Sequence, residues 1–196
     1  MSAAYHKTVD PAGDLSLSVG TDEKQMSMLV SSKVLSLASP VLAAMFGPNF
    51  AEGKAILNEG RPVNIGLPDD DPEAMLWICE ALHFRQHTTP EISFPLLEKL
   101  AGLCDKYDLS LALSPWSDVW LSHFKGSKDG EDHFVKMLWI SRELGNHRAF
   151  WRISKDMMRC YSSDGLEKEC KRAEKAERTT LAVVGMSLPV IACVFL

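Results

Sequence analysis

The chain has 196 residues, which is enough for one ordinary domain with an appendage or for two very small domains. Apolar residues make up 46% and charged residues 24%, which is the balance of a folded globular protein and excludes a disordered chain. The net charge is −5 and we find no cluster of Lys and Arg in the first 160 residues, so we expect no binding to nucleic acid.

Five cysteines are spread through the chain, and no two of them form a CxxC pair. An odd number at wide spacing is typical neither of a disulfide framework nor of a zinc site, so we expect buried thiols in a reducing compartment. The N-terminal residues lack the apolar core of a secretory signal. We therefore expect an intracellular protein, cytoplasmic and/or nuclear, without a cofactor. The cysteines are Cys79, Cys104, Cys160, Cys170 and Cys193.

The first half of the chain predicts strands on either side of a helical hairpin. Strict alternation of apolar and polar residues predicts a half-buried strand over residues 15–19. Helical spacing predicts a helix over residues 30–46, with a break where Ser39 caps a second short helix and Pro40 takes its first position. A loop follows, and residues 62–68 then predict a short strand.

The second half predicts helix after helix. Three aspartates at residues 69–71 favour a helix start, because carboxylates complement the free amides at that end. Prolines directly after Phe94 and Ser114 start two further helices, another helix stops at Gly145, and one more follows it. The predicted fold class is therefore α+β, a small mixed sheet backed by a helical hairpin and further helices, with helices dominant.

Five segments share the order and the patterns of one known family. Residues 13–20 (GDLSLSVG) place an acidic residue before a strand, and residues 30–46 (VSSKVLSLASPVLAAMF) form the helical hairpin. Residues 49–53 (NFAEG) supply a short acidic turn, residues 65–70 (IGLPDD) a junction from strand to helix, and residues 103–109 (LCDKYDL) an Asp-Lys-Tyr segment. In this order the five segments resemble the BTB/POZ family, in particular its fungal branch.

The resemblance implies a division of the chain. Residues 1–12 would be a flexible leader and residues 13–112 the BTB/POZ-like domain. Residues 113–163 resemble the helical extension of fungal relatives, and residues 164–196 would form a charged helix and an apolar tail. Ser31 stands where many members of the family carry histidine, so we expect no partner contact of the kind that uses that histidine.

The resemblance also implies a protein-interaction module that is not an enzyme. Some members of the family recruit cullin scaffolds of ubiquitin ligases through an apolar residue followed two positions later by an acid, and Leu96 and Glu98 lie at the matching distance from the Asp-Lys-Tyr segment. Alternatively, Leu96 belongs to the core and Glu98 faces solvent. Homodimerisation is the other habit of the family; it would use Leu15, Leu17 and Leu35, unless these residues fill the domain's own core.

Three functions stay open on this basis. The leading one is an interaction scaffold that serves as a substrate adaptor for a cullin-based ubiquitin ligase. The second is a homodimerising scaffold or a transcription-associated BTB protein without a role in ubiquitin transfer. The third and least favoured is a small metal-dependent enzyme, because the sequence contains no GxSxG, GxxxxGK[ST], GxGxxG or HExxH motif.

Three sets of residues could bind a ligand, and for each we favour a structural role. His83 and His87 are spaced to face one side of a helix as metal ligands, but no third ligand accompanies them, so we expect no metal. The aspartates at residues 69–71 could hold a cation, although helix capping explains them better. Four tryptophans lie in or beside apolar stripes, so we expect core packing rather than a ligand pocket: Trp77, Trp116, Trp120 and Trp151.

The C-terminal residues carry no charge after Arg178, and residues 181–196 are almost wholly apolar. In a helix these sixteen residues reach only about 24 Å, short of a hydrocarbon core of roughly 30 Å, and Pro189 interrupts them. Membrane association through residues 179–196 is therefore the minority hypothesis. The alternatives are packing on the helical extension or an error at the end of the coding sequence.

Overall fold

The computed structural model describes residues 5–21, 24–58, 62–85, 92–122, 124 and 131–160. The elements in these residues are, in chain order, β1 (Tyr5–Thr8), β2 (Leu15–Val19), β3 (Met26–Val30), α1 (Ser32–Ala38), α2 (Pro40–Met45), α3 (Ala51–Asn58), β4 (Val63–Leu67), α4 (Pro72–Leu82), α5 (Phe94–Lys106), α6 (Ser110–Ser122), α7 (Glu131–Glu143) and α8 (His147–Cys160). The predicted α+β fold class, with a mixed sheet and helices dominant, is confirmed.

The sheet has the strand order β1-β3-β2-β4. Strands β2 and β3 are antiparallel, whereas β1 pairs with β3 and β4 pairs with β2 in parallel. In β2 the side chains of Leu15, Leu17 and Val19 are buried and the serines between them are partly exposed. Strand β4 shows the same alternation of buried and exposed residues. Both strands that were predicted from alternating apolar residues are therefore confirmed, and each turns one face to the helices.

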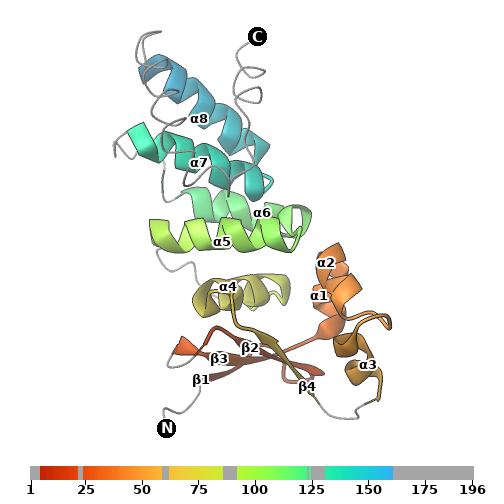
Figure 1. The fold of residues 1–196 in the computed structure, drawn as a ribbon. Helices are drawn as coiled ribbons and strands as arrows, with labels where there is room; N and C mark the ends of the chain where they lie inside the picture. The colour runs from red at the N-terminus through yellow and green to blue at the C-terminus, as the bar shows by residue number, and fades with distance from the viewer. Residues whose placement is uncertain are drawn as a thin grey trace.

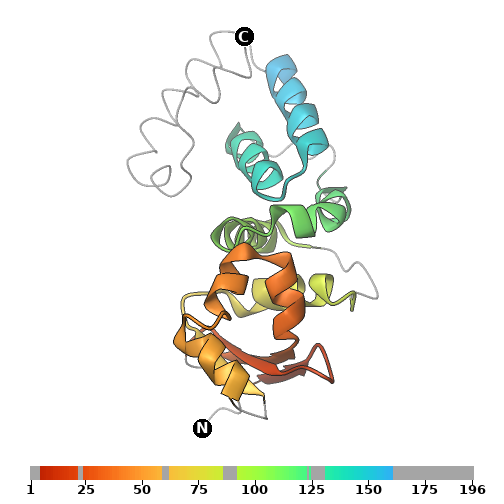
Figure 2. The ribbon, with the colours of Figure 1, turned by 90° about the vertical axis from the view of Figure 1, so that its right-hand side faces the viewer.

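The helices form layers that follow the chain away from the sheet (Figure 1). Helix α4 lies next to the sheet, α5 and α6 form the following layer, and α7 and α8 lie at the far end. The view turned by 90° shows α1 and α2 beside α4 (Figure 2). One apolar core runs from Val9 to Ile153 through all these layers. The boundary expected between residues 112 and 113 falls inside α6, so the helical extension shares the core of the preceding part.

Side-chain caps define where several helices begin. The hydroxyl of Ser39 accepts the backbone N–H of Leu42 at 2.9 Å, and Pro40 occupies the first position of α2, so the predicted break in the hairpin is confirmed. Helix α7 ends before Gly145, which has a φ of +66°. A Cβ atom at Gly145 would come within 3.0 Å of the carbonyl oxygen of Ser110, so glycine suits this turn on two counts.

Four expectations about the elements were wrong. The leader predicted over residues 1–12 contains strand β1. The sequence of β1 is largely polar and shows no strand pattern, because main-chain pairing with β3 stabilises this strand. The hairpin helix begins only after β3, which the sequence did not predict as a strand. Helix α3 occupies part of the expected loop. Helix α6 begins at Ser110 rather than at Ser114 and runs through Pro115, because its packing into the core compensates for the lost hydrogen bond.

Some predictions lie outside the described residues. These are the charged helix and apolar tail over residues 164–196, and His87. Among the helices that the structure describes, none combines the length and the apolar character needed to cross a bilayer.

Candidate functional site

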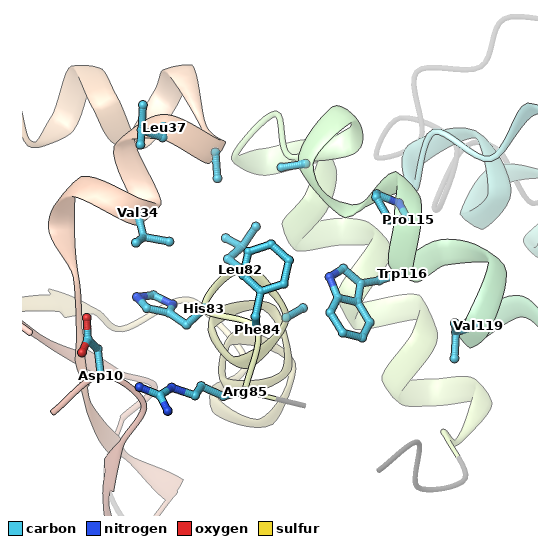
Figure 3. A pocket seen from close by; sticks show the side chains of 13 residues that line it. Asp10, Val34, Leu37, Leu82, His83, Phe84, Arg85, Pro115, Trp116 and Val119 are labelled. Atoms are coloured by element: carbon cyan, nitrogen blue, oxygen red, sulfur yellow. The ribbon is translucent and has the colours of Figure 1, made fainter. Parts of the chain in front are cut away.

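An apolar groove of about 660 Å³ opens between α1 and α6, above the C-terminal end of α4 (Figure 3). Apolar side chains dominate its lining, and the polar groups Asp10, His83 and Arg85 lie toward one end. The lining residues are Asp10; Val34, Leu37 and Ala38 of α1; Ala81 and Leu82 of α4; His83, Phe84 and Arg85 after α4; and Ala112, Pro115, Trp116 and Val119 of α6. An apolar hollow with a few polar groups is the usual form of a binding site.

Phe84 stands in the middle of this groove, between Val34 and Leu37 on one side and Trp116 on the other (Figure 3). Its side chain is 82% exposed, and its φ of +54° places the backbone in the left-handed region. Glycine is the residue that normally follows a helix in this conformation, since a Cβ atom there costs about 1–2 kcal/mol. Phe84 therefore contributes little to the core while its backbone is strained.

Leu37 is a second lining residue whose side chain is largely exposed. It is 81% exposed and lies on the α1 side of the groove (Figure 3). Single exposed apolar residues are ordinary, but two in the lining of one apolar hollow are typical of an interaction surface.

His83 fixes the end of α4 beside the groove. The backbone N–H of Ser31 donates to Nε2 of His83 at 3.0 Å. Because Nε2 accepts, the neutral ring carries its proton on Nδ1, which donates to the carbonyl oxygen of Cys79 at 2.7 Å. Both ring nitrogens of His83 are thus used within the protein, which favours the structural role over metal binding, and the described residues contain no cluster of three His, Cys, Asp or Glu side chains suited to a metal ion.

The Asp-Lys-Tyr segment links the end of α5 to the residues before α4 and to the start of α2. The hydroxyl of Tyr107 donates to the buried carboxylate of Asp70, and Nζ of Lys106 lies 2.5 Å from the other carboxylate oxygen. The carbonyl oxygen of Tyr107 accepts the hydroxyl of Ser39, the cap of α2, at 2.5 Å. Burial, followed by the neighbouring carboxylate of Asp70, raises the pKa of Tyr107, so its hydroxyl stays protonated and can donate.

The aspartates at residues 69–71 have separate structural tasks. Asp71 caps α4 by accepting the backbone N–H of Ala74 at 3.0 Å, so the capping prediction is confirmed for this residue. Asp70 binds the Asp-Lys-Tyr segment instead. Partial burial acts to raise the pKa of Asp71, but the hydrogen bonds from Lys99 and Ala74 outweigh it and hold the pKa below its ordinary value.

The residues predicted to bind cullin lie on α5, away from the groove. Leu96 is only 6% exposed and belongs to the core. The carboxylate of Glu98 lies 2.7 Å from Nζ of Lys136 on α7. Of the predicted pair, only Glu98 is therefore available at the surface.

The residues suggested for a dimer interface occupy the core of the single chain. Leu15 and Leu17 of β2 and Leu35 of α1 are all fully buried. In the single chain these residues therefore fill the domain's own core, as the alternative expected, and a dimer interface formed by them stays a prediction. The neighbouring residue Leu37, which departs from the apolar stripe of α1, is the exposed one.

The tryptophans divide between core and surface. Trp120 is buried and packs edge to face on Trp77, with the ring centroids 6.4 Å apart. Trp116 is partly buried and lines the groove. Trp151 of α8 is exposed, so the prediction of core packing is wrong for this residue.

Sequence reasoning missed the groove, although two signals for it were present. Leu37 lies off the helical stripe formed by Val34, Leu35 and Ala38, so its burial was not to be expected. Phe84 follows the last turn of a helix at a position where glycine is usual.

A scan against protein-family models and a search of curated proteins gave no match for this chain.

Proposed function

We propose that the chain is a non-enzymatic protein-interaction module, BTB/POZ-like, that binds an apolar segment of a partner protein in the groove between α1 and α6. Phe84 carries the proposal. Its ring is exposed and its backbone is strained, so a contribution to folding does not explain why a phenylalanine stands at this position. Backbone strain of this kind is often found at binding sites. Aromatic residues at the centre of an apolar hollow supply much of the energy of protein interfaces.

The shape of the surface favours a convex partner. The groove is concave and apolar, and the lining residue Leu37 is exposed. Two copies of a concave surface leave empty space between them, so a second copy of this chain fits less well than a protruding segment. We commit to an amphipathic helix of another protein, with large apolar side chains on one face and polar residues on the other.

The proposal is tested by selecting amphipathic helical peptides on the full chain and measuring their affinity by fluorescence anisotropy. Replacing Leu37→Ser should weaken binding at least about tenfold, since it removes an apolar contact of roughly 1.4 kcal/mol or more. Phe50→Ser is the matched control, because Phe50 is an exposed aromatic residue outside the groove lining. Equal losses for both variants, or a dimer of the full chain that dissociates only in the Leu37 variant, would refute the assignment.

A cullin-adaptor role is the second candidate function. The surface position of the Glu98 carboxylate favours it. This carboxylate lies at the surface near the Asp-Lys-Tyr segment and pairs with Lys136. A pull-down with cullin should lose signal with Glu98→Gln and keep it with the matched change Glu52→Gln in α3. Equal binding of wild type and Glu98→Gln, or no binding of either, removes the adaptor role assigned to this residue.

A further inference from the structure

Helix α8 turns one face to the core and the opposite face to solvent. Ala149, Ile153 and Met157 are buried in its inner face. The outer face carries three cations and an aromatic residue, which lie within two turns on one side of the helix: Arg148, Trp151, Arg152 and Lys155. We call these four residues the basic face of α8. This face was not expected from the sequence, where no basic cluster is evident in the first 160 residues, because the cations are separated along the chain and meet only on a helix.

Trp151 lies in the middle of the basic face and is 61% exposed. Nζ of Lys155 lies 4.0 Å from the centroid of its ring, so the aromatic surface and the charge form one patch. The sequence of α8 contains four Arg and Lys residues and a single acid, Asp156, although the whole chain is acidic. Positive charge is therefore concentrated on this helix.

The position of α8 suits contact with an extended surface. Helices α7 and α8 form the end of the molecule farthest from the sheet in both views (Figures 1 and 2). The interaction groove lies nearer the middle, between α1 and α6. A surface at the α8 end therefore leaves the groove open to a partner.

We propose that the basic face of α8 binds an anionic membrane surface. Lys and Arg side chains are attracted to anionic headgroups, and Trp prefers the interface between water and lipid because it has an apolar body and a polar N–H group. Trp151 decides between a membrane and an acidic protein as the partner. An acidic protein would account for the cations of the basic face, but a membrane interface accounts for the exposed indole among them as well.

The test is flotation of the full chain with vesicles of phosphatidylcholine alone and with vesicles that also contain phosphatidylserine. We expect binding to the anionic vesicles that weakens with added salt. Each cation contributes about fivefold, so Arg148→Gln, Arg152→Gln and Lys155→Gln together should lower the affinity about a hundredfold. The matched control replaces three exposed lysines elsewhere, Lys24, Lys33 and Lys54, by Gln and should keep most of the binding.

Several outcomes would overturn the proposal. A loss in the control variant as large as in the α8 variant would assign the binding to net charge rather than to this face. Equal binding to neutral vesicles would assign the membrane binding to apolar side chains alone and not to the cations of α8. No binding to either vesicle, together with binding of polyglutamate that the α8 variant loses, would make an acidic protein the partner. Thermal unfolding of both triple variants checks that they are folded.

Discussion

Replacing Phe84 separates folding from binding at the centre of the groove. In Phe84→Gly the left-handed backbone loses a strain of about 1–2 kcal/mol, while the added freedom of glycine in the unfolded chain costs about 0.5–1 kcal/mol. The lost side chain is 82% exposed, so its burial contributes at most roughly 0.5 kcal/mol. The net gain of about 0.5–1 kcal/mol, less at most roughly 0.5 kcal/mol for the lost side chain, means that the free energy of unfolding should stay the same or rise by up to about 1 kcal/mol.

A second substitution isolates the strain. Phe84→Ala also lacks the ring but keeps a Cβ atom at a φ of +54°, so the glycine variant should be more stable than the alanine variant by about 0.5–1 kcal/mol. Urea unfolding of the three proteins measures these differences. Binding of a groove-specific peptide should fall about thirtyfold in both variants, as expected for the loss of a central aromatic contact of roughly 2 kcal/mol.

A free energy of unfolding lowered by more than about 1 kcal/mol in Phe84→Gly would show that the side chain contributes to folding and would refute its assignment to binding. Binding of the peptide by both variants as tightly as by the wild type would refute it equally. A stable variant that has lost binding is the expected result, because binding sites often carry groups that do not favour stability.

Three further predictions concern stability and reactivity. Tyr107→Phe removes a hydrogen bond to a buried carboxylate and should lower the free energy of unfolding by about 1.5–3 kcal/mol, measured in urea; a change under about 0.5 kcal/mol would contradict this role. Partial burial acts to raise the pKa of Asp14, but the hydrogen bonds from Ser32 outweigh burial and hold this pKa below the ordinary 3.8. The ionised Asp14 therefore stabilises the fold above pH 3.8, and this stabilisation is lost as the pH falls through the pKa of the folded state. Asp14→Asn should therefore flatten the acid side of the stability curve, and an unchanged acid side would refute the assignment. Burial raises the pKa of Cys79 and Cys104 to about 12, so neither thiol should react with iodoacetamide in mildly alkaline buffer, and peptide mapping that finds either one alkylated in the folded protein would contradict this.

Local rules predicted the elements whose own sequence determines them. Strand β2 alternates cleanly, and the cap and proline at Ser39 and Pro40 mark the break of the hairpin regardless of the remaining chain. Strand β1 was not predicted, because its four residues show no apolar alternation and depend on pairing with β3. The role of His83 escaped for a similar reason, since its partner Ser31 lies 52 residues earlier in the chain.

The groove could not be predicted because it arises where three distant segments meet. Leu37, Phe84 and Ala112 come from α1, from the end of α4 and from α6. No local period encodes a hollow between such elements. The cullin prediction had the opposite weakness: the spacing of Leu96 and Glu98 is local and easily found, but the packing of α5 buries the leucine.

Photocrosslinking in the full chain shows directly whether a partner occupies the groove. Benzoylphenylalanine adds a benzoyl group to the ring of Phe84 or Phe50; both positions are exposed, but only Phe84 lies in the groove. We expect an adduct at position 84 with an amphipathic helix of a second protein and no such adduct at position 50. Equal adducts at both positions, an adduct only with another copy of this chain, or none at position 84 would contradict this expectation.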